Sequence, residues 1–378
     1  AHVHLTLRRG ETSVEHVQRV SEHQALLRGV QVARQILAAG VTTVRDCASR
    51  GLTGQSLRDG VRDGFIAGPR ILVSGPPVTT TSGHLWALGY ESDTVEQARS
   101  AVRRLVKEGV DLIKVCATGG GMTPGSVVGR AQYTAEELRA IVEDAHRLER
   151  PVAAHVHGTE GIARAVEAGV DTLEHVSWLD SSGHGHAFDE RVARQMAEKG
   201  IFANIASSPL RSLVERGRAA EGAAPSALSA PSARSAPSAP PIPPTVGDAR
   251  TRTPSSAAGQ PDTAGVRASL ARWEFARRMI ELGVPVCFST DAVYGYWDDG
   301  HDLSYLAQAL VEVGGFVPLD VIRMITAIPA QAIGSGDRLG TIAEGNLADL
   351  LLVAADPIEN IRALHDVRAV YKEGILAA

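Results

Sequence analysis

Short runs of β-branched and apolar residues alternate along the chain with amphipathic stretches, at intervals of roughly 20 to 40 residues. This alternation is typical of strand–helix–strand units, in which the strands form a parallel sheet. Seven strands are predicted, at residues 41–47, 70–75, 111–117, 151–156, 171–176, 201–207 and 284–290.

The stretches between these runs carry helix signals. Amphipathic helices are predicted at 95–108, 135–149, 161–168, 189–199 and 270–282. Thr134 followed by Glu137 reads as a capping box, in which each side chain bonds to the other's backbone. A glycine follows four of the five helices, as expected just past a helix C-terminus: Gly109, Gly169, Gly200 and Gly283.

The strand count favours a (β/α)₈ barrel of the TIM type over an open doubly wound sheet. Seven strands do not close a barrel, and we expect residues before His2 to supply the eighth, so that the first strand is truncated here. The open sheet is disfavoured because no G-x-G-x-x-G follows a first strand. The glycines at 119–121 do not open a helix, so we interpret them as a flexible loop and not a phosphate cradle.

The barrel is expected to span residues 1–335, with a low-complexity insertion at 209–268. This insertion consists largely of Ala, Ser, Pro, Gly and Arg, so it lacks the apolar surface that would offset its ordering entropy. We predict that it is disordered, and that it is a passive insertion in preference to a lid over the catalytic face.

The remaining residues, 336–378, are expected to be a remnant of a composite β-sandwich. Helices are predicted at 301–313 and 318–333, and short strands at 339–342, 348–354 and 367–371. Three strands are too few for an independent domain, so partner strands are expected before Ala1.

Composition narrows the class of partner. The chain of 378 residues has 38 Lys and Arg against 43 Asp and Glu, without a basic block, which disfavours nucleic-acid and membrane partners. The three cysteines, Cys47, Cys116 and Cys287, lie far apart, which favours a reducing, cytoplasmic location over a disulfide framework. A signal upstream of Ala1 and a homo-oligomer both stay open.

Coordinating residues recur at the predicted strand ends. His2 and His4 are spaced so that both imidazoles point to one side of a strand. One such pair is weak evidence, since each histidine can also be a core residue. However, barrel enzymes place their catalytic groups at the C-terminal ends of strands, and five different strands carry a coordinating residue inside the strand or at that end: His4, Lys114, His155, His175 and Asp291.

Lys114 lies in the middle of the apolar strand Leu-Ile-Lys-Val-Cys, where an unpaired buried ammonium is costly. One interpretation is an ordinary ion pair with a carboxylate. The other is a carbamate, formed when the neutral amine takes up carbon dioxide, whose two oxygens can bridge two cations. The strand alone does not decide between them.

With these motifs in order, the sequence resembles the amidohydrolase superfamily, in its imidazolonepropionase-like branch with prolidase-like Xaa-Pro and Xaa-Arg dipeptidases. The resemblance covers the chain except the insertion. It rests on His2-Val3-His4, Gly-Val-Thr-Thr-Val-Arg-Asp at 40–46, Ser82-Gly83-His84, Ile113-Lys114, Ala-His-Val-His-Gly at 154–158, Glu174-His175, Ser289-Thr290-Asp291, and residues 338–342 and 345–350.

The resemblance implies a binuclear centre of two Zn²⁺ or other divalent ions. His2, His4 and Asp291 would bind one metal, His155 and His175 the other, and Lys114, carboxylated by CO₂, would bridge them. A hydroxide shared by the metals would be the nucleophile, with Asp291 as general base and then acid. His84 would recognise a substrate carbonyl or carboxylate, and His157 would support the site or the substrate. We interpret His184 and His186 as exposed loop histidines.

The sequence therefore predicts a zinc-dependent hydrolase of an amide bond in a small molecule, such as a dipeptide, an N-acyl amino acid or a cyclic amide. The alternative is a truncated, catalytically inactive barrel that acts as a binding protein. A mononuclear deaminase of the same superfamily is disfavoured because such deaminases generally lack the bridging lysine.

Overall fold

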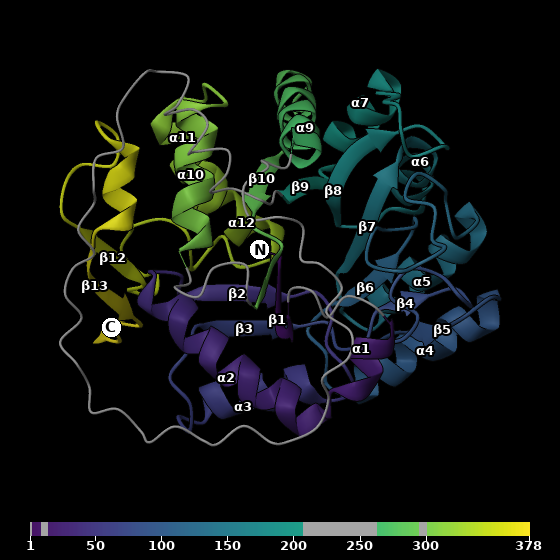
Figure 1. Cartoon of the computed structure of the whole chain (residues 1–378), viewed down its shortest axis with the longest axis horizontal. Coiled ribbons are helices and arrows are strands. Elements are labelled where there is room, and N and C mark those ends of the chain that lie inside the picture. Colours follow the sequence, from purple (N-terminus) through teal and green to yellow (C-terminus); the bar gives the residue numbers. More distant parts are fainter. Residues whose placement is uncertain (1, 9–13, 207–262, 295–300) are drawn as a thin grey trace, which may run out of the picture.

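The computed structural model describes residues 2–8, 14–206, 263–294 and 301–378. Its framework is a barrel of parallel strands, and all seven strands predicted for the barrel are present (Figure 1). The eight barrel strands are β1 (Val3–Arg8), β2 (Thr43–Asp46), β3 (Arg70–Val73), β6 (Ile113–Cys116), β7 (Val152–Gly158), β8 (Thr172–Leu179), β9 (Phe202–Ala206) and β10 (Val286–Ser289).

The eighth strand differs from the expectation. It was expected from residues before His2, whereas β1 begins at Val3 and pairs in parallel with β2, Val3 opposite Asp46. The physical reason is that Val3-His4-Leu5-Thr6-Leu7 alternates in the way a strand requires, with Leu5 fully buried in the core. The histidine pair is therefore at the start of this strand.

The barrel consists of two hydrogen-bonded sheets that meet at two seams. One sheet has the order β11-β1-β2-β3, where β11 is Ala292–Tyr294. The other has the order β10-β9-β8-β7-β6-β4-β5, with β4 at Val78–Thr79 and β5 at Tyr90–Glu91. At one seam the amide of Asp291 donates to the carbonyl of His2 (3.2 Å). At the other, the amide of Asp111 donates to the carbonyl of Val73 (2.8 Å).

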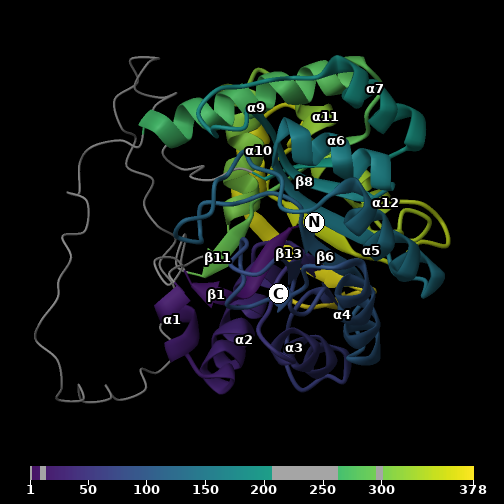
Figure 2. The same ribbon diagram turned by 90° about the vertical axis from the view of Figure 1, so that its right-hand side faces the viewer.

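Helices cover the outside of the strands (Figures 1 and 2). The predicted capping box at Thr134 is confirmed, and Gly169 and Gly200 end their helices with left-handed backbones, as expected. The helices are α1 (Val14–Arg19), α2 (Glu22–Ala38), α3 (Thr53–Arg62), α4 (Val95–Lys107), α5 (Ala135–Arg147), α6 (Thr159–Ala168), α7 (Glu190–Lys199), α9 (Thr263–Glu281) and α10 (Asp302–Glu312).

The predicted helix at 318–333 is divided in two, α11 (Pro318–Ile325) and α12 (Ala327–Ala332). Pro329 has no amide hydrogen to donate to the carbonyl four residues earlier, so an unbroken helix would be interrupted here. Thr326 lies between the two helices with a non-helical backbone.

The C-terminal strands form a small antiparallel sheet of β12 (Leu350–Val353), β13 (Val367–Lys372) and β14 (Ile375–Leu376). The strand predicted at 339–342 is wrong, because Gly340 has a left-handed backbone and Thr341 is held in a turn by the Asn346 side chain. Arg70, at the start of β3, joins this sheet to the barrel through Asp349 (3.0 Å) and Glu373 (2.5 Å).

Most of the predicted insertion, 209–268, lies outside the described residues. Its last six residues, 263–268, are the first residues of α9, so the helix begins earlier than the predicted residue 270. Within the described ranges, no helix combines the length and apolar character that crossing a membrane requires. Cys47, Cys116 and Cys287 are buried free thiols.

The main core lies between the strands and the surrounding helices, and Leu138 of α5 is fully buried in it. We expect Leu138→Ala to lower the free energy of unfolding by about 2–5 kcal/mol, because it removes apolar contacts and leaves a cavity. Leu27→Ala on α2, where the side chain is 70% exposed, should change it by less than about 0.5 kcal/mol. Urea unfolding of both variants is the measurement, and equal midpoints would contradict this packing.

Candidate metal centre

One cavity in the barrel is lined by every site residue predicted from the sequence. Its volume is about 150 Å³. The predicted residues that line it are His2, His4, His84, Lys114, His155, His157, His175 and Asp291, and the others are Leu85, Gly121, Met122 and Arg272.

The first cluster in the cavity consists of His2, His4 and Asp291, whose potential ligand atoms all lie within 4.8 Å of one another. Asp291 Oδ1 is 3.2 Å from Nε2 of His4 and 3.4 Å from Nε2 of His2. These residues come from β1 and from the end of β10, so the seam between the two sheets brings them together.

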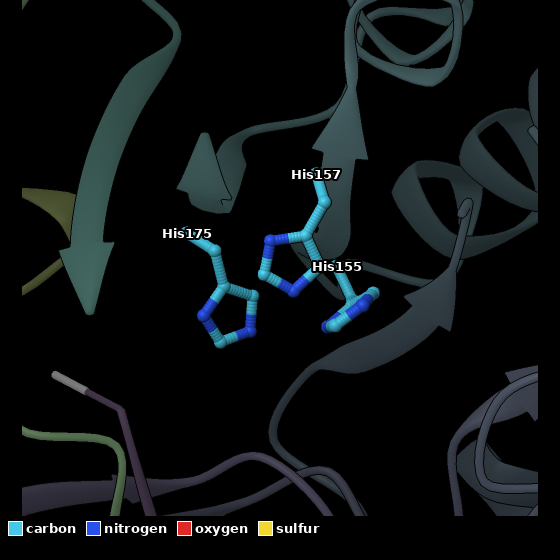
Figure 3. A group of neighbouring side chains, drawn as sticks. All are labelled: His155, His157 and His175. Atoms are coloured by element: carbon cyan, nitrogen blue, oxygen red, sulfur yellow. The ribbon is translucent and has the colours of Figure 1, made fainter. Parts of the chain in front are cut away.

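The second cluster consists of His155 and His157 of β7 and His175 of β8 (Figure 3). The rings of His157 and His175 are stacked, with centroids 4.7 Å apart, and the ring of His155 lies 4.7 Å from that of His175. From the sequence, His157 was expected to support the metal site or to contact the substrate. In the structure it lies among the potential ligands, where Ser177 Oγ is 2.8 Å from its Nδ1.

A hydrogen-bond argument indicates a cation in the first cluster. His2 Nδ1 lies 2.7 Å from Glu174 Oε2, so it carries the proton that this bond needs and Nε2 presents a lone pair. That lone pair faces the carboxylate of Asp291, which is also an acceptor. A divalent cation between these atoms would satisfy both, and nitrogen and carboxylate donors suit Zn²⁺.

Two buried nitrogens in the site also have no hydrogen-bond partner among the described residues, Lys114 Nζ and His4 Nδ1. Lys114 is only 1% exposed. The ion pair with a carboxylate, which was one interpretation of its sequence, is not found in the part of the chain that the structure describes. The residues present therefore fit a metal site with a modified or metal-facing lysine.

Burial keeps four of the site imidazoles neutral at pH 7, those of His2, His155, His157 and His175, and the neutral form is the one that binds metals. Burial and then the charge of Lys114 lower the pKa of His2 to about 4. Burial also lowers the pKa of His157 to about 3, and it holds the pKa values of His155 and His175 well below their usual range.

Asp291, in contrast, is ionised because its neighbours favour the charged carboxylate. Its burial would raise the pKa of the carboxyl, but His2 and His4 beside it outweigh this effect and lower the pKa to about 2. The residue also has a left-handed backbone, with φ of 50°, and His175 has φ of 72°. Such backbones are strained for residues other than glycine and are concentrated at functional sites.

His84 reaches the cavity from the loop after β4, and the glycine loop at 119–121 packs against it. The Gln132 side chain accepts from the His84 amide (2.6 Å), and the His84 ring lies 4.4 Å from that of His155. A Cβ on Gly120 would lie 2.4 Å from the His84 ring, so only glycine fits there. Gly119 contributes a carbonyl 3.1 Å from His155 Nε2.

Sequence reasoning assigned no role to Glu174, a fully buried carboxylate behind His2. Besides His2, it accepts from Asn204 Nδ2 (2.5 Å) and Thr172 Oγ1 (3.1 Å), and it forms an ion pair with the buried Arg45. Burial would raise the pKa of Glu174, but Arg45 and His2 hold it well below its usual range. This network fixes the ring and tautomer of His2.

A signal for this network was available in the sequence. Arg45 and Glu174 are charged residues inside apolar strands, the same pattern that drew attention to Lys114. His184 and His186, in contrast, are exposed on the loop after β8, as expected.

Comparisons with known proteins agree with this geometry. A model of the amidohydrolase family matches residues 1–376. The chain is 30% identical over 371 residues to ochratoxinase of Aspergillus niger, an alignment that covers 90% of this chain and 66% of that protein. The chain thus spans just under two thirds of that relative.

Solved structures of related proteins are similar to this chain over nearly its whole length. A Xaa-Pro dipeptidase with bound methionine in the active site has a TM-score of 0.72 and 26% identity, covering 99% of this chain and 84% of that one. The crystal structure of A. niger ochratoxinase has a TM-score of 0.74 and 27% identity, covering 99% and 81%.

We expect Glu174→Gln to weaken zinc binding by roughly 10- to 100-fold, because the variant keeps the side-chain size but no longer orients His2 with a charge. It should also lower the free energy of unfolding of the metal-free protein by about 3–5 kcal/mol, since Arg45 is left without its buried counter-charge. Chelator competition and urea unfolding are the measurements. Glu160→Gln on the exposed face of α6 is the matched control and should change neither.

Proposed function

Because the chain belongs to the amidohydrolase family, we propose that it hydrolyses a carbon–nitrogen amide bond in a small molecule, with two divalent metal ions bound in the barrel cavity. The observation that carries this proposal is the meeting of two histidine clusters around a buried lysine without a partner among the described residues.

We assign the ligands to the two metals as the family resemblance implies. His2, His4 and Asp291 would hold one metal, and His155 and His175 the other, with His157 available beside them. When bound, zinc ions lower the pKa of water towards 7 and polarise a carbonyl group. The chain's own residues orient the substrate and move the proton.

Lys114, carboxylated to a carbamate, would be the remaining ligand for the metals. Two observations support the carbamate. Lys114 is buried, and its Nζ has no hydrogen-bond partner among the described residues, although a buried ammonium would need one. A carbamate replaces that cation with two acceptor oxygens, and these suit two cations.

Asp291 would be the general base and acid. Its carboxylate is ionised and lies in the cavity beside both His2 and His4. It would accept a proton from the attacking water and deliver it to the leaving nitrogen, while the carbon–nitrogen bond breaks and the carbonyl carbon gains the hydroxyl. His84 would hold the substrate carbonyl from the opposite loop.

The substrate class would be an N-acyl amino acid, a dipeptide or a related amide. Support comes from the similar proteins, among them the Xaa-Pro dipeptidase, a prolidase complexed with N-methylphosphonate-L-proline, and ochratoxinase. A screen of dipeptides and N-acyl amino acids for hydrolysis tests this directly.

Metal content is the first test. We expect about two zinc ions per chain after reconstitution with zinc and bicarbonate, and loss of activity on chelation. His155→Ala should lose at least one ion per chain, whereas His184→Ala, at an exposed histidine, should keep both. Elemental analysis of fewer than one zinc per chain, with no gain on reconstitution, would overturn the metal proposal.

Asp291→Asn tests the proton transfer. The variant keeps a side-chain oxygen that can bind metal but cannot accept the proton, so we expect kcat to fall at least roughly 100-fold with zinc retained. Asp320→Asn on the exposed side of α11 is the control and should leave kcat unchanged. Normal turnover by Asp291→Asn would exclude this residue as the base.

A further inference from the structure

Once the proposed metal ligands and His84 are assigned, few groups that line the cavity are left to contact a substrate. Leu85 and Met122 offer apolar surface, and Gly121 offers backbone. The remaining charged group in this lining is Arg272 of α9. Apart from the proposed ligands and the other histidines, the cavity lining thus offers a substrate one positively charged side chain and a small apolar surface.

The guanidinium of Arg272 is poorly satisfied by the protein. Its Nη2 donates to Ser269 Oγ at 3.4 Å, and its Nε is buried without a hydrogen-bond partner among the described residues. No carboxylate of those residues lies within ion-pair distance of it. Burial lowers the pKa of Arg272, and Asp291 only partly opposes this effect.

Arg45 is a useful comparison, because its buried guanidinium has a structural role. Arg45 is paired with the carboxylate of Glu174 and also donates to Thr172 Oγ1 (3.2 Å). Arg272 has no such counter-charge in the described structure. A planar guanidinium is suited to two parallel bonds with a carboxylate, and it keeps its charge in a protein.

Arg272 and Asp291 line the same small cavity, so a substrate bound there is within reach of both residues. Asp291 is the residue assigned to protonate the leaving nitrogen. A carboxylate held by Arg272 would therefore lie close to the scissile amide, and in N-acyl amino acids and dipeptides the carboxylate next to that bond is carried by the amine half.

We propose that Arg272 binds a free carboxylate on the amine half of the substrate, which selects N-acylated amino acids and dipeptides over amides without a charge there. This inference rests on the proposed amide hydrolysis and makes Arg272 a specificity-determining residue. Leu85 and Met122 would contact the apolar part of the same substrate. Cyclic or aryl amides without a carboxylate are expected to be poor substrates.

The test compares matched pairs of substrates that differ only at this group. N-acetyl-L-amino acids and Xaa-Pro dipeptides are assayed beside their C-terminal carboxamides with the zinc-loaded enzyme. We expect kcat/KM to be roughly 10- to 100-fold higher for the carboxylates, as expected for loss of a charge-assisted hydrogen bond. Equal kcat/KM within the pairs would overturn the assignment.

Two variants then assign the preference to the residue. Arg272→Gln should reduce kcat/KM for the carboxylates to the level of the carboxamides, mainly through KM, and leave the carboxamides unchanged. Arg272→Lys should restore part of the preference, because it keeps the charge without the fork geometry. Arg267→Gln, on an exposed position of the same helix, is the matched control and should behave as the wild type.

A binding measurement separates the possible failures. Calorimetry of the zinc-loaded protein with N-methylphosphonate-L-proline, which carries a carboxylate, should show affinity that falls at least roughly 10-fold in Arg272→Gln. Hydrolysis of neither member of any pair would contradict the proposed function. Hydrolysis of both members with a preference that survives Arg272→Gln, in a variant with wild-type thermal stability, would contradict the role of Arg272 alone.

Discussion

The buried charge of Glu174 is the interaction on which the arrangement of the site depends. It neutralises Arg45, orients His2 and accepts from Asn204, so it connects strands β1, β2, β8 and β9 at one point inside the barrel. Each of these groups would be costly to bury alone. Together they fix the ring of His2, and His2 fixes the position from which the first cluster can bind a cation.

The backbone also holds two of the proposed ligands in place, His175 within β8 and Asp291 just after β10. His175 and Asp291 both have left-handed φ values, and Val176, whose branched Cβ makes this conformation especially unfavourable, has φ of 45°. All four residues of β10 and all but the last residue of β8 are buried, and this packing can hold such strain. The barrel thus supplies the rigidity that turns these side chains toward one another.

Much of this could be predicted from the sequence, because the periodicity of strands and the positions of coordinating residues are local signals. The strand carrying Lys114 and the one carrying His155 were predicted within a few residues, and each residue of the proposed site lines the one cavity. What could not be predicted depends on which strands become neighbours. The pairing of Glu174 with Arg45 joins residues 129 positions apart, and Arg272 of α9 lines the same cavity as Asp291, which follows β10.

The seam between β10 and β1 has a consequence for synthesis. Its hydrogen bond from Asp291 to His2, and the first cluster beside it, join positions separated by 289 residues (291 − 2). At translation rates of about 5–20 residues per second, roughly 15–60 s pass between the emergence of the first and the last ligand from the ribosome. During that interval His2 and His4 lack the carboxylate of Asp291, so the complete ligand set forms late in folding.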